Sequence, residues 1–85
     1  MLLSKDKVLE FFSKFNIPLN GKKKISDNEY QELADYSKDM GASFLFFLEY
    51  YIIADKNLLF CPFLDEENLY DTYCEFMTGW FDFKA

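Results

Sequence analysis

The segment FLFFLEYYII, residues 44–53, constrains the fold more than any other part of this 85-residue chain. Nine of its ten residues are apolar or aromatic, and the exception is Glu49. Taken as a helix from Ser43 to about Asp55, the segment is apolar on nearly all sides, and such a helix has to be surrounded by other elements. The run is too short to span a membrane, which takes about 20 residues. The sequence therefore predicts a central buried helix that the rest of the chain covers.

A β-hairpin is a second interpretation of the same region. LEYYIIA and LLFCPF are rich in residues that favour strands, and DKN between them is a typical turn. Pro62 then restricts the second strand to the edge of a sheet, because proline donates no backbone hydrogen bond. The length of the run and its Gly-Ala-Ser start favour the helix, but periodicity leaves the hairpin open.

The first 24 residues predict an amphipathic helix and then a loop. Ser4 is placed to cap a helix that ends near Asn16. The apolar residues at helical spacing are Val8, Leu9, Phe12 and Phe15. The following NIPLNGKKK combines Pro18, Asn20 and Gly21 with three lysines, so we expect an exposed loop there.

Two further helices are predicted from their caps. SDNE is a capping box, in which Ser26 caps the helix and Glu29 reaches back, and Gly41 is placed to end this helix. Its inward residues are Tyr30, Leu33, Ala34 and either Tyr36 or Ser37. In the last segment, Asp65 is placed to cap a helix that Gly79 ends. The apolar face of that helix is formed by Leu69, Tyr73, Phe76 and Met77.

Together these segments predict a mainly α fold, a small single-domain bundle of about four helices around the apolar central segment, over residues 1–85. The alternative is an α+β fold with a hairpin at residues 48–63. A chain of this length hides only about 60 to 65 per cent of the surface that its unfolded form exposes, which suffices for one core. Three short helices cover the central segment incompletely, so we expect an aromatic patch to stay exposed beside acidic residues.

The net charge of −6 comes entirely from the C-terminal half. Residues 1–40 hold seven lysines and seven acidic residues, whereas residues 41–85 hold two lysines, eight acidic residues and 13 of the 18 aromatic residues. Nucleic acids and anionic membranes bind clustered basic residues, so we expect no direct contact with either. The partner that such a surface complements is a basic protein.

The residue types that are missing argue against most familiar enzymes. The chain has no histidine and no arginine, which removes the commonest general base, the commonest metal ligand and the bidentate phosphate ligand. We therefore expect no enzyme activity, no metal and no cofactor. Cys61 and Cys74 are expected to be buried, reduced thiols, as is usual in the cytoplasm, and the N-terminal segment MLLSKDKVLEFF has no signal-peptide pattern. The predicted location is the cytoplasm.

Acidic and aromatic residues of the C-terminal half form the predicted partner-binding surface. Glu67, Asp71 and Glu75 follow one another at intervals of four residues, which places like charges on one helix face at a cost of roughly 0.2–0.5 kcal/mol per pair. A partner-free explanation is also open, because acidic residues suit the positive N-terminal end of a helix. Tyrosine and tryptophan are typical interface anchors. The predicted set is Tyr50, Tyr51, Asp65, Glu66, Glu67, Tyr70, Asp71, Glu75 and Trp80.

The preferred hypothesis is a small non-enzymatic inhibitor that blocks a basic functional surface of a partner protein. In composition and size the chain is similar to acidic single-domain inhibitors, namely immunity proteins of nuclease toxins, anti-restriction proteins and anti-CRISPR proteins. This similarity implies a nuclease toxin or another nucleic-acid-binding protein as the partner. The alternative is a subunit of a homodimer or larger complex, in which the apolar patch is a permanent interface.

A third hypothesis rests on the segment DMGASFLFFLEYY and on KVLEFFSKFNI before it. These residues resemble the part of acyl carrier proteins in which an Asp-Ser-Leu motif opens a helix and the serine carries phosphopantetheine. The resemblance implies that Ser43 is the attachment site. The motif differs on both sides of this serine, with Ala42 in place of the aspartate and Phe44 in place of the leucine.

Overall fold

A computed structural model describes the backbone of residues 2–84 and the side chains of residues 2–79. Within this range the chain forms four helices and a three-stranded antiparallel sheet. The elements are α1 (Lys5–Lys14), β1 (Lys22–Lys24), α2 (Asp27–Met40), α3 (Ala42–Tyr51), β2 (Ile53–Asp55), β3 (Leu58–Phe60) and α4 (Leu69–Lys84). The fold is therefore mainly α with a small hairpin, so each of the two interpretations is confirmed in part.

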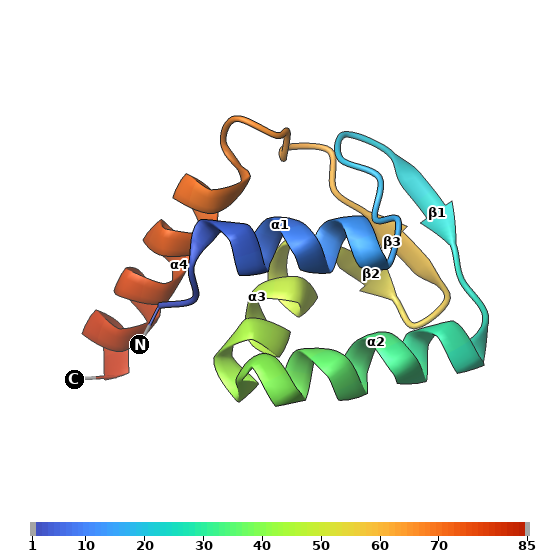
Figure 1. The fold of residues 1–85 in the computed structure, drawn as a ribbon, viewed down its shortest axis with the longest axis horizontal. Helices are drawn as coiled ribbons and strands as arrows, with labels where there is room; N and C mark the ends of the chain where they lie inside the picture. The colour runs from blue at the N-terminus through green and yellow to red at the C-terminus, as the bar shows by residue number, and fades with distance from the viewer. Residues whose placement is uncertain (1, 85) are drawn as a thin grey trace.

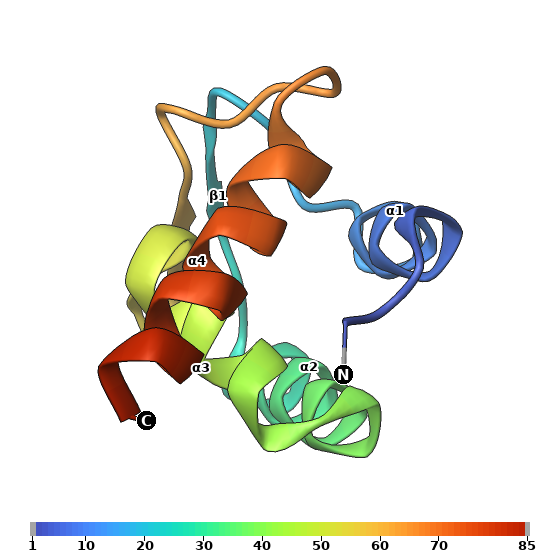
Figure 2. The same cartoon turned by 90° about the vertical axis from the view of Figure 1, so that its left-hand side faces the viewer.

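The other elements pack against one side of α3, and Figure 1 shows their arrangement. The sheet lies at one end of the molecule and α4 at the other, with α1 running between them and α2 along the lower edge. Seen from the side of α4, α1 lies to one side of that helix and α3 to the other (Figure 2). The loop of residues 61–68 passes over the top of the molecule, from the end of β3 to the start of α4.

The apolar segment of residues 44–53 is divided between a helix and a strand. α3 ends at Tyr51 and not near Asp55, and the hairpin begins two residues later. The hairpin is short because residues 48–51 remain in α3 and β3 ends at Phe60. In its turn, the backbone N–H of Asn57 donates to the carboxylate of Asp55, at 3.4 Å. The side-chain amide of Asn57 also donates to the backbone oxygen of Ile25, at 2.9 Å, which ties the turn to the chain just before α2.

The prediction of an exposed loop at the three lysines is wrong, because Lys22–Lys24 form strand β1. This strand pairs antiparallel with β3, with Lys22 opposite Phe60 and Lys24 opposite Leu58. Lys23 faces inward, where its ammonium donates to the backbone oxygen of Phe15 at 3.1 Å and satisfies the end of α1. A lysine-rich strand is suited to a sheet edge, because its charges discourage pairing with another chain.

The same sheet corrects the prediction for Pro62. The strand order is β1-β3-β2, so the strand nearest this proline is the central one and not an edge strand. Pro62 does not interfere, because β3 ends at Phe60. The backbone N–H and carbonyl of Cys61 still pair across, with the carbonyl of Gly21 and the N–H of Asn20.

The core is built around one side of α3. Phe44, Phe47 and Leu48 of α3 are at most 1 % exposed. The other residues of the hydrophobic core come from the remaining three helices, from β3 and from the connecting segments: Val8, Phe11, Phe12, Ile17, Ile25, Leu33, Ile52, Leu59, Cys61, Leu64, Leu69, Tyr73 and Met77. The opposite side of α3 is not covered, since Phe46 and Tyr50 are 47 % and 73 % exposed. The expected exposed aromatic patch is therefore present.

α4 is fixed to the start of the chain by two tyrosines. The backbone N–H of Leu3 donates to the hydroxyl of Tyr73 at 3.0 Å, and the hydroxyl of Tyr70 donates to the backbone oxygen of Leu3 at 2.7 Å. Tyr73 is fully buried, as expected for a residue on the apolar face of this helix. This burial raises the pKa of its hydroxyl above the usual value.

α4 departs from the prediction at both ends. It begins at Leu69, so Asp65, Glu66 and Glu67 lie in the preceding loop, and it continues through Gly79 to Lys84. A glycine ends a helix readily when it takes a positive φ, and of the three glycines, all within the described backbone, only Gly41 does so, with φ of 131°. Gly41 ends α2 as predicted, and α3 starts at the next residue.

The capping box of α2 is confirmed. The hydroxyl of Ser26 accepts from the backbone N–H of Glu29, and the Glu29 carboxylate accepts from the backbone N–H of Ser26, both at 3.1 Å. Hydrogen bonding with Ser26 holds the pKa of the Glu29 carboxyl below its usual range. The backbone N–H of Ser26 contributes most to this shift, and its side chain contributes second. On the inward face, Leu33, Ala34 and Ser37 are buried, so Ser37 and not Tyr36 is the inward residue of that pair.

Substituting Ser26→Ala is expected to lower the free energy of unfolding by about 1 kcal/mol, because one N-terminal backbone N–H loses its acceptor. Urea unfolding followed by circular dichroism measures this change. The control is Ser13→Ala, at an exposed position inside α1, which is expected to change stability by less than about 0.5 kcal/mol. Equal effects of the two substitutions would contradict the capping role.

Candidate functional site

The loop that connects the sheet to α4 is held at its base by buried residues. Cys61 and Leu64 are at most 1 % exposed, and they anchor the loop to the core. The thiol of Cys61 donates to the backbone oxygen of Pro18, at 2.7 Å. Desolvation by burial raises the pKa of this thiol, so it stays protonated at neutral pH. The loop therefore leaves the sheet from a fixed position.

A reciprocal set of hydrogen bonds closes the part of this loop that we name the acidic turn, residues 63–68. The carboxylate of Asp65 accepts from the backbone N–H groups of Glu67 and Asn68, at 2.9 and 2.8 Å. The side chain of Asn68 accepts from the backbone N–H of Asp65 and donates to the backbone oxygen of Phe63. The predicted cap at Asp65 thus exists, but it closes a turn that precedes the helix.

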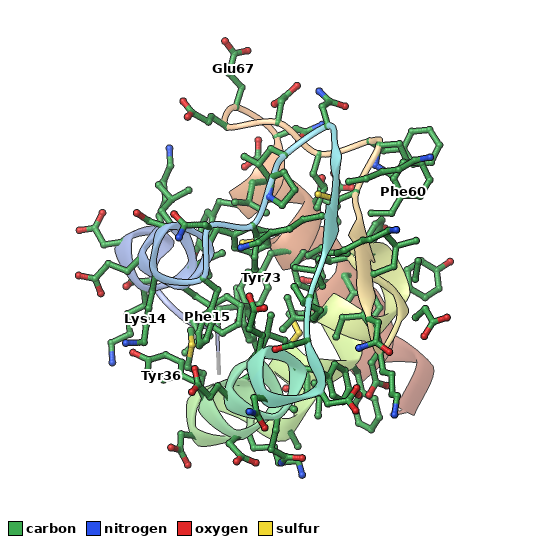
Figure 3. The ribbon with its side chains drawn as sticks, turned by 90° about the vertical axis from the view of Figure 1, so that its right-hand side faces the viewer. Lys14, Phe15, Tyr36, Phe60, Glu67 and Tyr73 are labelled. Carbon is green, nitrogen blue, oxygen red and sulfur yellow. The ribbon has the colours of Figure 1, made fainter. Side chains whose placement is uncertain are left out.

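This turn presents an aromatic ring and carboxylates to solvent. Phe63 is 80 % exposed, more than any other large apolar side chain among residues 2–79. Glu66 and Glu67 are exposed, and Figure 3 shows Glu67 pointing away from the body of the molecule. Among the described side chains, no lysine lies within 4 Å of either carboxylate. The ion pair that these side chains do form joins Lys56 to Asp27, outside the turn. The charge of the turn is therefore not neutralised by close internal pairing.

A groove adjoins the acidic turn on the side of α1. Its volume is about 560 Å³, and Glu66 forms part of its wall. The other lining residues come from α1 and the segment after it: Lys5, Leu9, Phe12, Ser13, Asn16 and Ile17. The groove thus joins apolar side chains of α1 to a carboxylate of the turn.

The remaining acidic residues of the predicted set lie on α4. Asp71 and Glu75 are exposed and four residues apart, so they share a helix face. Glu67 precedes the helix, so the predicted three-residue stripe is reduced to these two on α4 itself. Tyr70, which the sequence placed in the binding surface, is half-buried and bound to Leu3. Its position serves the attachment of the N-terminal segment.

Tyr50, a predicted tyrosine of α3, belongs to a second surface, which we name the α3–α4 surface. It is a shallow depression lined by Phe46, Glu49, Tyr50 and Phe76, and it includes none of the residues of the acidic turn. Tyr51 is half-buried against Phe47, with ring centres 5.3 Å apart. The side chain of Trp80, also in the predicted set, lies outside the described residues.

Phe63 is not in the predicted set, because the interface anchors expected from the sequence are tyrosine and tryptophan. A signal was present, since CPFLDEEN places this phenylalanine between a proline and a run of turn-forming and acidic residues. Burial of the neighbouring Leu64 does not follow from that pattern.

The fold also separates the lysines and the acidic residues whose charges cancel in the sum over residues 1–40. Residues 1–26 hold six lysines and two acidic residues, whereas α2 holds five acidic residues and one lysine. Two of the lysines of β1 have internal partners, because Lys23 binds the end of α1 and Lys22 lies 5.3 Å from the ring centre of Phe60. A second acidic surface therefore lies on α2, apart from the acidic turn.

Cys61 and Cys74 are free thiols. Cys61 is buried as expected, whereas Cys74 is only half-buried, so that part of the prediction is wrong. Among the described residues no three potential ligands are grouped to hold a metal ion, and none of the helices has the length and apolar character needed to cross a membrane. Ser43 is half-buried in the first turn of α3, the helix at the centre of the core.

Comparison of the chain with protein-family models, with curated proteins and with solved structures gave no significant match.

Proposed function

We propose that this protein is a non-enzymatic binding protein whose acidic turn docks on a basic surface of a partner protein and blocks it. The observation that carries the proposal is Phe63, which is 80 % exposed on a turn that hydrogen bonds hold together. Beside it lie the carboxylates of Glu66 and Glu67, which form no ion pair with any described side chain. Exposing a phenylalanine on a rigid turn has no benefit for the free protein. Burial against a partner explains it.

The binding mechanism follows from the two kinds of side chain in the turn. Glu66 and Glu67, with Asp71 and Glu75 on α4, attract a positively charged surface and raise the rate of encounter. Phe63 then becomes buried in the complex, and the preformed turn loses little conformational entropy on binding. A basic surface that binds nucleic acid in a nuclease toxin or a related protein is the target that fits this chemistry, so docking there inhibits the partner.

Reversing two charges of the acidic turn, Glu66→Lys with Glu67→Lys, is expected to raise the Kd for the partner at least about tenfold, because like charges then face each other. The partner is first isolated from the host with the tagged wild-type protein and then purified for calorimetric titration. Binding by the wild type is also expected to weaken with increasing salt.

The matched control carries the same change in net charge at other exposed positions, Glu10→Lys on α1 with Glu49→Lys on α3. It is expected to bind the partner almost as tightly as the wild type. Equal weakening by both double variants, or binding that does not depend on salt, would contradict docking through the acidic turn. Weakening by the control alone would place the contact elsewhere.

A self-associating subunit is the competing function, and the α3–α4 surface is the observation that favours it. Tyr50 is 73 % exposed there, and its ring packs on Phe76 and Tyr51, with centres 5.6 and 4.9 Å apart. A second copy of the chain would bury this ring. The two functions differ in the surface used, so substitutions on one surface leave the other intact.

A further inference from the structure

The chain places one of its own cations against two aromatic rings in a groove between α1 and α2. The ammonium of Lys14 lies 5.2 Å from the ring centre of Tyr36 and 5.9 Å from that of Phe15. Both distances fall within the roughly 6 Å over which an aromatic face attracts a cation. The two rings are 5.6 Å apart with their planes at 70°, so they form two adjacent walls. Figure 3 shows the three side chains together between the two helices.

Carboxylates of α2 complete this groove, which we name the cation groove. Its volume is about 340 Å³, and the acidic residues that line it are Glu32, Asp35 and Asp39. One oxygen of Asp35 accepts from the side-chain amide of Gln31 at 2.9 Å. Among the described side chains, none of the three carboxylates lies within 4 Å of Lys14. Three negative charges therefore surround a single positive one without a close ion pair.

Lys14 is held weakly enough to be replaced. Its side chain is exposed, and an exposed cation–π contact contributes little in water. Fixing a lysine side chain also costs rotamer entropy, which opposes the contact. The ring of Tyr36 is 41 % exposed, so a group that approaches from solvent can reach it.

We propose that the cation groove binds an arginine side chain of a basic peptide segment and that Lys14 occupies the groove when no such segment is bound. A guanidinium is planar, stacks on an aromatic ring and pairs with a carboxylate through two hydrogen bonds, so it uses the rings and the acids together. An ammonium such as that of Lys14 is a point charge and uses them less fully. The groove lies on the far side of α1 from Glu67 (Figure 3), so this proposal does not rest on the acidic turn.

The test is a titration of the protein with the peptide acetyl-Gly-Arg-Gly-amide, followed through the NMR signals of the Tyr36 ring. Substituting Lys14→Gln is expected to tighten peptide binding about two- to fivefold, because the competing cation is removed. Substituting Tyr36→Leu is expected to weaken binding by a similar factor, and for this variant the titration is followed through the signals of the Phe15 ring, which also lines the groove. The matched control is Lys7→Gln, which removes the same charge from an exposed position of α1 outside the groove.

The control is expected to bind the peptide with an affinity close to that of the wild type. If Lys14→Gln and Lys7→Gln tighten binding equally, net charge alone is responsible and the proposal fails. It also fails if the arginine peptide leaves the Tyr36 signals unchanged, or if acetyl-Gly-Gln-Gly-amide shifts them to the same extent. Because the probe is a defined peptide, none of these outcomes depends on the partner proposed for the acidic turn.

Discussion

Replacing Phe63 with alanine is expected to weaken binding of the partner at least about 30-fold, the effect of an interface residue that contributes 2 kcal/mol or more. Phe63 is 80 % exposed in the free protein, so removing its ring is expected to lower the stability of the complex and not that of the free protein. The free energy of unfolding of the unbound protein is expected to change by less than about 0.5 kcal/mol. Calorimetric titration with the partner and urea unfolding of the free protein measure the two effects.

The matched control is Tyr50→Ala, which removes a ring of comparable exposure, 73 %, from the α3–α4 surface. This variant is expected to bind the partner with nearly unchanged affinity. If it loses binding while Phe63→Ala retains it, the acidic turn is not the interface and the aromatic residues of α3 are.

Replacing Phe47 with alanine is expected to lower the free energy of unfolding by about 3–5 kcal/mol, because it removes buried surface and leaves a cavity. Phe47 is fully buried, and its ring contacts Phe44, Tyr51, Tyr73 and Phe76. An 85-residue domain of ordinary stability has only about 4–13 kcal/mol in total. The variant is therefore expected to be partly or wholly unfolded at 37 °C.

Phe63→Ala serves as the comparison for this substitution, since it is chemically identical and differs only in burial. Thermal unfolding followed by circular dichroism is expected to show a clearly lower melting temperature for Phe47→Ala than for Phe63→Ala. Similar melting temperatures would contradict the account of α3 as the centre of the core.

The helices that the sequence predicted well are those whose limits depend on nearby residues. Ser4 and Ser26 cap their helices, and Gly41 ends α2, because each acts through hydrogen bonds or dihedral angles within a few residues. α4 shows the limit of this reasoning. Gly79 has the residue type of a helix end, but the helix continues because a glycine inside a helix costs only about 1 kcal/mol.

The sheet was harder to predict because its strands are defined by partners far away in the sequence. Lys22–Lys24 have no strand propensity of their own, and they form β1 only because β3 offers unpaired backbone groups 36 residues later. In the same way, Ile53 lies in a strand although it continues an apolar helical run. The local sequence pattern does not predict which distant strands pair.

The candidate site also combines features that the sequence predicts with features that tertiary packing decides. Acidic residues were expected at 65–67 and are exposed there, because charge is readable from composition alone. Which aromatic residues remain exposed depends on tertiary packing, which buries Tyr73, half-buries Tyr70 and leaves Phe63 outside. The cation groove was hidden for a further reason, since averaging charge over residues 1–40 cancelled the lysines of α1 and β1 against the acids of α2.

The most direct test of the central claim is the native mass of the protein purified gently from its own host, measured at low and at high salt. The account predicts a complex with a second protein of basic isoelectric point, which dissociates at high salt and does not form with the Phe63→Ala variant. A mass that is a multiple of the monomer, unchanged by salt and by that substitution, would contradict it and favour a self-associating subunit. A monomer heavier by one phosphopantetheine would contradict it in favour of Ser43.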